Sequence, residues 1–408
     1  MEIKLRTGVW LFFSLVVIVL LLQATHPSWY WHLHTDINVY FARASYFLNN
    51  KGLVGLVGNE YQPGALFFFI ALSPILLIIS TFKAYLLMVF AANILLLGLL
   101  SLLYKKVENI FLFLLILLLT GPIVLARFDI FVMCLLVASF FFWKREKHIL
   151  ATLLLAIAAL VKIFPAVLVP YYLILTFKNR GIKETLNILL VFLAGYFGFL
   201  IIFTLLFRAP LSILFESFKF LSKAPIHTES VWGTAMTLIA KLGTGSYAKG
   251  TGAWGIFGID PSYTVGPLNF YNYFWIFSVV LFYVWLFPKL KKDSGFDVRI
   301  CIVAIMLFLV FSKIIHHQYT LWFMLLFPLL NIKYLLTQTR DLINLFLILL
   351  MTSINQYIYP LNYTNFISGF YADGSYSYLF WLATLRNILL ILILARLFIE
   401  VRESFKIH

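Results

Sequence analysis

The chain has 408 residues, of which 63% are hydrophobic and only 12% charged, and its mean hydropathy is +0.98. Soluble domains carry about 45–50% apolar and about 25% charged residues, so this composition excludes a soluble globular protein. It predicts an all-α polytopic membrane protein, in which lipid replaces water around most of the chain.

The net charge of +15 comes from short basic clusters that separate the apolar runs. This placement is typical of the cytoplasmic loops of membrane proteins and not of a nucleic-acid-binding surface. With every cluster in the cytoplasm, both termini are expected to be cytoplasmic too. Cys134 and Cys301 lie inside apolar runs, so no disulfide framework is expected. The clusters are Lys4/Arg6, Lys105/Lys106, Lys144/Arg145/Lys147, Lys178/Arg180/Lys183, Lys289/Lys291/Lys292, Lys333/Arg340 and Arg396/Arg402/Lys406.

The apolar runs predict the membrane topology. Residues 9–24 lack a small-residue cleavage site, so we expect a retained helix and not a signal peptide. Two cytoplasmic termini require an even number of spans, and the short run 64–80, which contains Pro74, is the weakest. We therefore expect about 12 transmembrane helices and a re-entrant or interfacial helix at 64–80. The expected spans lie near residues 8–25, 84–104, 109–126, 128–143, 149–163, 164–177, 186–207, 271–288, 299–315, 319–332, 342–359 and 377–397.

This topology places three segments outside the membrane, at about 26–63, 208–270 and 360–376. Isolated charges outside the basic clusters fall in these segments or at the outer ends of spans. Ionisable groups cost roughly 2.5–3.5 kcal/mol at the centre of a span, so they mark functional sites by default. The alternative is that each long side chain reaches out to the membrane interface.

The first outer segment contains the candidate catalytic acid. On a helix, Asp36, Tyr40 and Arg43 would share one face. Asp36 could take a proton from an incoming hydroxyl, with Arg43 stabilising the carboxylate. The alternating His32, His34 and Asp36 could instead ligate a metal, although interfacial histidines are commoner.

Three later cations, Arg127, Lys162 and Lys313, have too few nearby acids in the sequence to neutralise them. Unpaired cations around a polar cavity favour an anionic ligand, and phosphate is the obvious one. Asp129 leaves open a local ion pair with Arg127. Further polar candidates for substrate or phosphate binding are Glu229, which could equally be a solvated loop charge, and His316, His317 and Gln318.

Taken together and in chain order, these polar motifs resemble those of the membrane-embedded GT-C glycosyltransferases, closest to glycosyltransferase family 87 and the GPI-type mannosyltransferases. The resemblance covers roughly residues 26–330. It rests on Asp36/Tyr40, Tyr61-Gln62-Pro63, Arg127-Phe128-Asp129, Lys162-Ile163-Phe164-Pro165, Glu229-Ser230-Val231-Trp232 and His317-Gln318-Tyr319 with Trp322 and Pro328.

The resemblance implies a single integral membrane domain over residues 1–408, with a catalytic core at about 1–330 and C-terminal helices at about 331–408. It implies transfer of a hexose, such as mannose, from a polyprenyl-phosphate sugar to a glycan or lipid-linked acceptor on the outer face, with inversion and with Asp36 as base. Some relatives have a second acid where this chain has Asn38, so a metal-independent site is favoured and no cofactor is expected.

Two other functions fit a multi-span protein with fixed outer charges. An O-antigen ligase or polymerase also uses lipid-linked sugars, but it depends on a large outer loop rich in Arg and His. A flippase or solute transporter would need charges or broken helices near mid-membrane, whereas these charges gather at the outer ends of the spans. The glycosyltransferase is therefore the favoured prediction.

Overall fold

The computed structural model describes residues 2–53, 61–104, 106–210, 212, 215–219, 224, 226–243, 250–251, 257–259, 273–330, 339–363, 365–366 and 378–405. The chain divides into two compact units. The first contains residues 1–221, 290–296 and 325–329, and the second contains residues 222–289, 297–324 and 330–408.

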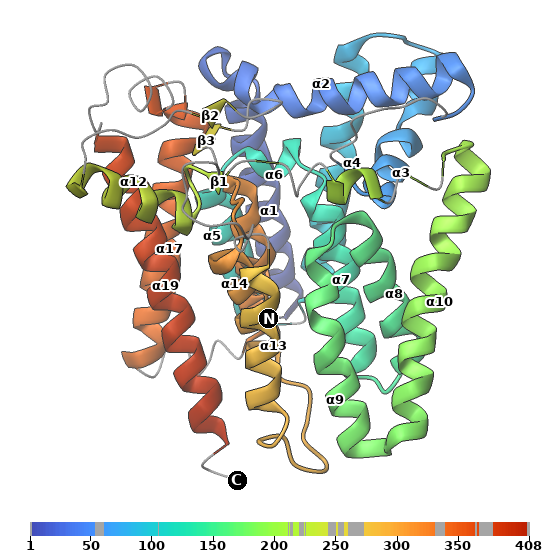
Figure 1. Ribbon diagram of the computed structural model, residues 1–408. Coiled ribbons are helices and arrows are strands. Elements are labelled where there is room, and N and C mark those ends of the chain that lie inside the picture. Colours follow the sequence, from blue (N-terminus) through green and yellow to red (C-terminus); the bar gives the residue numbers. More distant parts are fainter. Residues whose placement is uncertain are drawn as a thin grey trace. The chain divides into compact units, whose positions relative to one another are not determined.

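The first unit is almost wholly helical (Figure 1). Proline at the first or second position starts several of its helices, where a missing N–H is tolerated. Gly121 and Gly181, both at positive φ, end α5 and α9. Its elements are α1 (Glu2–Ala24), α2 (Pro27–Asn50), α3 (Pro63–Ala71), η1 (Ser73–Leu77), α4 (Phe82–Leu103), α5 (Val107–Thr120), α6 (Ile123–Ala126), α7 (Asp129–Trp143), α8 (His148–Val161), η2 (Phe164–Leu168), α9 (Val169–Arg180), α10 (Ile182–Phe207) and η7 (Phe327–Leu329).

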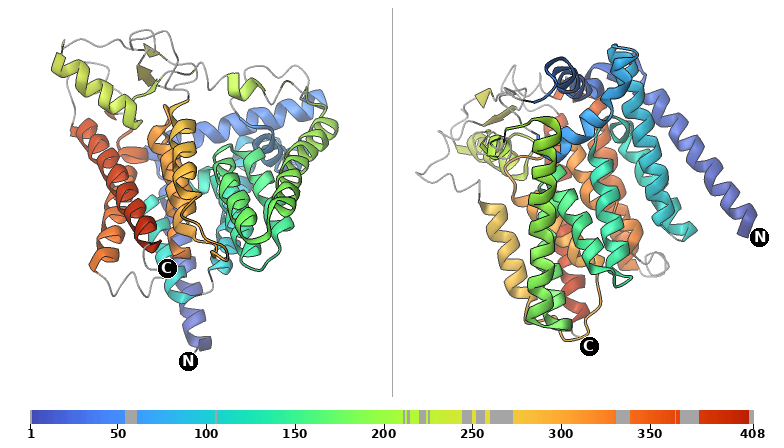
Figure 2. Two further views of the ribbon diagram at one scale, coloured as in Figure 1. Left: turned by 60° about the horizontal axis from the view of Figure 1, so that its bottom comes forward. Right: turned by 90° about the vertical axis from the view of Figure 1, so that its right-hand side faces the viewer.

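Helices α7 to α10 form an antiparallel group, which stays together in the other views (Figure 2). The basic loops 144–147 and 178–183 lie at one end of this group, and α2 crosses the opposite end (Figure 1). The Asn179 side chain accepts a hydrogen bond from Asp293 N (2.8 Å) and donates one to Ser294 O (3.1 Å), which holds the loop 290–296 at the basic end. The basic loops 144–147 and 178–183 and the loop 290–296, which contains Lys291 and Lys292, therefore share one end of the first unit, away from α2.

The second unit combines helices with a small sheet. Strand β3 lies between β1 and β2 and is antiparallel to both, with Ile226 opposite Ile259 and Thr251 opposite Phe257. The longest helices, α17 and α19, pack side by side (Figure 1). Its elements are β1 (Ile226–His227), α12 (Val231–Gly243), β2 (Gly250–Thr251), β3 (Phe257–Ile259), α13 (Phe274–Leu286), α14 (Val298–Phe311), η6 (His317–Thr320), α15 (Leu321–Met324), α17 (Thr339–Gln356), η8 (Tyr357–Leu361) and α19 (Tyr378–Ser404).

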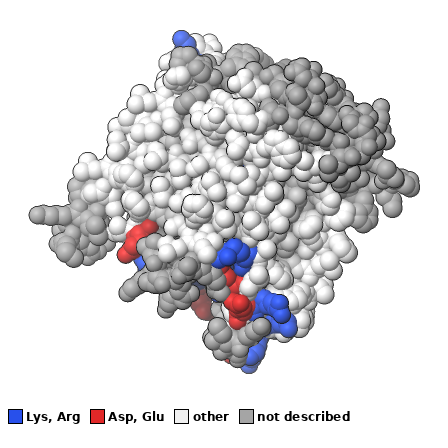
Figure 3. Space-filling view, turned by 90° about the vertical axis from the view of Figure 1, so that its left-hand side faces the viewer, with Lys and Arg blue, Asp and Glu red and all other residues white. Residues whose placement is uncertain are grey.

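The described helices expose apolar side chains, as is typical of a membrane protein. Large apolar side chains are exposed along α10 and α19, including Leu205 and Trp381. The face in Figure 3 carries few charges across its middle, and its charged side chains gather mainly at one edge. Within the part of the chain that the structure describes, four helical segments are long and apolar enough to span a bilayer: Phe82–Leu103, Ile182–Phe207, Leu342–Leu361 and Tyr378–Ser404. The same described residues form six further apolar helices of 10–17 residues. The predicted number of about 12 spans stays a prediction.

Several segments differ from the sequence expectations. The run 164–177 is divided into η2 and α9, because Pro165 and Pro170 interrupt the backbone hydrogen bonds of a continuous helix. The run 319–332 forms short turns, η6, α15 and η7, as far as the structure describes it. The three short strands were not expected in an all-helical chain. The segment 64–80 folds as α3 and η1, neither of which is long enough to span a bilayer.

Candidate active site

Asp36 lies on α2 and forms an ion pair with Arg127, which follows the short helix α6. The Asp36 side chain keeps 30% exposure, whereas Arg127 keeps 7%. Tyr40, one turn further along α2, is buried and stacks on Phe69 with ring centroids 4.0 Å apart. Asp36 is therefore anchored by a buried cation but remains accessible to a substrate. Arg43 is half-buried on the same helix.

Arg127 and Lys162 both sit where a helix is broken. Each residue has an extended backbone, Arg127 between α6 and α7 and Lys162 at the end of α8. Helix ends leave backbone carbonyls without intrahelical partners. The buried Asn93 side chain on α4 satisfies two of them, donating to Leu125 O (2.7 Å) and Arg127 O (3.1 Å). These breaks let two cations project from apolar segments.

Lys162 is paired with Asp129, the first residue of α7. The Lys162 Nζ lies 2.5 Å from Asp129 Oδ1, and the Asp129 side chain is fully buried. The same ammonium lies 4.8 Å from the centre of the Phe128 ring. We call Asp36, Arg127, Asp129 and Lys162 the Asp36 cluster.

The expectation of unpaired cations is wrong for the Asp36 cluster. Arg127 pairs with Asp36, and Lys162 pairs with Asp129. The sequence placed Arg43 beside Asp36, but Arg127 is the cation that the structure shows paired with it. The two pairs are formally neutral, so an anionic ligand would have to compete with carboxylates for the cations.

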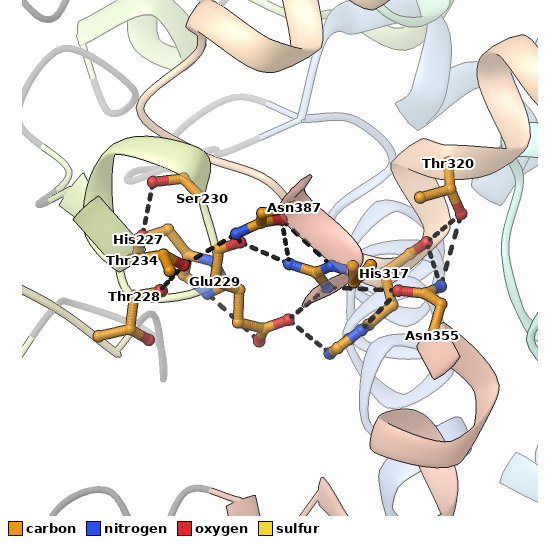
Figure 4. Close-up of polar contacts among 10 residues, drawn as sticks. His227, Thr228, Glu229, Ser230, Thr234, His317, Thr320, Asn355 and Asn387 are labelled. Carbon is orange, nitrogen blue, oxygen red and sulfur yellow. Dashed lines mark hydrogen bonds and ion pairs between the residues drawn. The ribbon is translucent and has the colours of Figure 1, made fainter. Parts of the chain in front are cut away.

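A second polar group surrounds Glu229, between β1 and α12 in the second unit (Figure 4). Glu229 Oε2 lies 2.7 Å from His317 Nε2 and 3.5 Å from Arg386 Nη1, and Oε1 lies 3.8 Å from His227 Nε2. Arg386 Nη2 also donates to the Glu229 carbonyl (2.5 Å), as does the Asn387 amide (3.1 Å). With Asn355, these residues form what we call the Glu229 network.

Both ring nitrogens of His317 are engaged inside this network. Nδ1 lies 3.2 Å from Asn355 Oδ1, an oxygen that also accepts from Arg386 (3.3 Å). The Asn355 amide nitrogen donates to His317 O (3.0 Å), which fixes the orientation of that side chain. His317 therefore links Glu229, through Nε2, to Asn355, through Nδ1.

Neighbouring charges shift the pKa values of the ionisable groups in the Glu229 network. Burial raises the pKa of the Glu229 carboxyl, but His317, His227 and Arg386 outweigh burial and hold that pKa below its usual range. Burial lowers the pKa of His227, and the neighbouring Glu229 carboxylate offsets part of this effect. Glu229 is only 2% exposed, and the alternative of a solvated loop charge is therefore wrong.

The remaining predicted residues of this unit flank the network. The Lys313 ammonium donates to Ala224 O (2.6 Å), and the Lys313 carbonyl accepts from His227 N (2.8 Å). The His316 ring lies 4.8 Å from that of His227. His316 and Gln318 are half-buried. The His32 side chain of the candidate metal set lies outside the described residues.

Sequence reasoning missed four residues that the structure brings into these sites: Asn93, Asn355, Arg386 and Asn387. Each is a polar side chain within an apolar run, and Arg386 lies inside the expected span 377–397. An ionisable residue at such a depth is itself a signal, because it is costly without a partner.

We expect Arg386→Met to lower the stability of the protein strongly. Removing one partner of a buried ion pair typically costs about 3–5 kcal/mol, because the other charge is left uncompensated. Thermal unfolding in detergent measures the effect. Arg180→Met is the control, since Arg180 pairs with the exposed Glu146 (2.8 Å) and such pairs contribute about 0–1 kcal/mol. Equal shifts of the two unfolding midpoints would contradict the assigned role of Arg386.

Comparison with known proteins identifies the family of the chain. The family model of glycosyltransferase family 87 matches residues 60–312, more than half of the chain. The matched region contains Arg127, Asp129, Lys162 and Glu229, whereas Asp36 precedes it. Neither the curated proteins nor the solved structures give a significant match. The chain therefore belongs to glycosyltransferase family 87, a family of GT-C type membrane glycosyltransferases.

Proposed function

We propose that this glycosyltransferase moves a hexose, most simply mannose, from a polyprenyl-phosphate sugar to a glycan or lipid-linked acceptor on the outer face of the membrane. The observation that carries the proposal is the pair formed by Asp36 and Arg127. It combines an accessible carboxylate with a buried guanidinium, which suits a reaction that releases a proton and a phosphate at adjacent positions.

The proposed reaction is a single displacement. The acceptor hydroxyl oxygen attacks C1 of the donor sugar, and Asp36 takes the hydroxyl proton. The bond between C1 and the phosphate oxygen breaks, and the lipid phosphate leaves with the electron pair. Because attack and departure occur on opposite sides of C1, the configuration at C1 is inverted.

Arg127 and Lys162 would stabilise the negative charge on the departing phosphate. Both cations pair with carboxylates in the structure. A bound phosphate would share Arg127 with Asp36, leaving Asp36 free to accept the proton. A guanidinium has several donors in one plane and can serve two anions at once.

The other predicted residues take supporting roles in this proposal. Tyr40 fixes α2 through its ring contacts. Arg43 would help to stabilise the Asp36 carboxylate, and Asp129 holds Lys162 in place. Lys313, His316 and Gln318 remain proposed substrate or phosphate contacts. Glu229 and His317 are proposed to order the segment that precedes α12. The reaction as written requires no metal ion.

We expect opposite accessibility for the two ends of the first unit. A cysteine replacing the exposed Asn38, near Asp36, should react with an impermeant thiol reagent added from outside. A cysteine replacing Arg145, in a basic loop at the opposite end, should react only after permeabilisation. Labelling of both positions from the same side would contradict the proposed orientation.

The donor sugar can be identified with a panel of radiolabelled polyprenyl-phosphate hexoses. Purified protein is incubated with each donor and with membrane extract as the source of acceptor. Transfer from the mannose donor is expected to exceed transfer from glucose or galactose donors. A preference for another hexose would correct the sugar, and the absence of any transfer would contradict the donor class.

A further inference from the structure

Gln62, immediately before α3, is a buried glutamine whose side chain is 5% exposed. Among the residues that the structure describes, neither its amide nitrogen nor its amide oxygen has a hydrogen-bond partner. Buried polar atoms in native proteins are nearly always hydrogen-bonded, so each exception requires an explanation. Asn93, a buried amide in the same unit, donates two hydrogen bonds.

The residues on both sides of Gln62 contact the neighbours of Arg127 and Lys162. The Tyr61 ring lies 5.9 Å from the ring of Phe128, which follows Arg127. Gly64 packs so tightly that an added Cβ would lie 2.7 Å from Val161 N, one residue before Lys162. Gln62 is therefore held beside the Asp36 cluster by contacts on both sides of it.

The chemistry of an amide discriminates between the two parts of the proposed donor. Gln62 presents a donor at Nε2 and an acceptor at Oε1. A phosphate offers only acceptors and would leave Oε1 unsatisfied. Neighbouring sugar hydroxyls each donate and accept, and so can satisfy both amide atoms.

On the basis of the proposed function, we propose that the Gln62 side chain binds hydroxyl groups of the transferred hexose, donating from Nε2 and accepting at Oε1. Gln62 is then a specificity-determining residue for the sugar. A site built to hydrogen-bond a hydroxyl strongly rejects an analogue that lacks it, because the buried polar atoms are then left unpaired.

The test compares Gln62→Leu with Asn93→Leu. Leucine at position 62 removes an unsatisfied amide, so the unfolding midpoint in detergent should rise by about 2–4 °C. Leucine at position 93 removes two donated hydrogen bonds, so the midpoint should fall. In spite of its higher stability, Gln62→Leu should lose about 10-fold in kcat/KM for the donor. A purely structural role of Gln62 would not combine a higher unfolding midpoint with a lower kcat/KM.

A direct binding measurement separates this proposal from the proposed reaction. Mannose 1-phosphate should raise the unfolding midpoint of the wild-type protein and raise that of Gln62→Leu by less, because the cations would still bind the phosphate. Equal shifts in both proteins, or a lower midpoint for Gln62→Leu without ligand, would overturn the assignment of Gln62. If the wild-type protein binds the sugar phosphate through Gln62 but transfers nothing from lipid-phosphate donors, only the proposed reaction fails.

Discussion

Asp36→Asn is expected to slow glycosyl transfer about 10²–10⁴-fold while donor binding is retained. A general base contributes about this factor, and asparagine is nearly isosteric with aspartate but cannot accept the proton. Donor affinity should survive, because Arg127 and Lys162 remain to meet the phosphate. Turnover and donor affinity of the purified variant, measured separately, distinguish loss of chemistry from loss of binding.

The matched control is Asp297→Asn. Asp297 also pairs with an arginine, Arg299 (2.7 Å), and caps α14 by accepting a hydrogen bond from Arg299 N (2.9 Å). Asparagine is as good a cap as aspartate, so this variant should transfer sugar at a near-native rate. If Asp36 only anchors α2 through Arg127, Asp36→Asn would lower stability and keep its turnover, which would remove the proposed base.

Lys162→Met is expected to reduce transfer about 10²–10³-fold, because it removes a cation that would face the charge on the departing phosphate. The same substitution leaves the buried Asp129 carboxylate without its cation and should cost about 3–5 kcal/mol of stability. The single variant therefore combines an effect on chemistry with an effect on folding.

The double variant Asp129→Asn/Lys162→Met separates these effects. It removes both charges, so most of the lost stability should return, while transfer stays low because the cation is still missing. Unfolding midpoints and transfer rates of the single and double variants provide the comparison. Recovery of transfer together with stability would show that Lys162 has only a structural role.

The broad features of this protein follow from its sequence because they depend on local properties. Composition alone specifies a helical membrane protein, and Pro165 marks a real helix break next to Lys162. The isolated positions of Arg127 and Lys162 in apolar sequence correctly indicated a polar cluster, which both residues join. The order of short motifs was sufficient to identify the family.

The pairing of the charges could not be predicted, because it depends on contacts between distant segments. Asp36 has Arg43 nearby in the sequence, but nothing in the sequence indicates that the break between α6 and α7 brings Arg127 to Asp36. Arg386 lies in an apolar run without a recognisable motif, and only the fold shows that it holds the Glu229 backbone. A single sequence shows that a charged residue lies in an apolar run, but it does not show which residue pairs with that charge.

The most direct test of the account is the choice of donor by the purified protein in liposomes. Radiolabelled mannose is offered either as polyprenyl-phosphate mannose or as GDP-mannose, with the same acceptor lipids present. We expect a labelled glycan product, inverted at C1, from the lipid-phosphate donor alone. Transfer from GDP-mannose without the lipid-phosphate donor would contradict it.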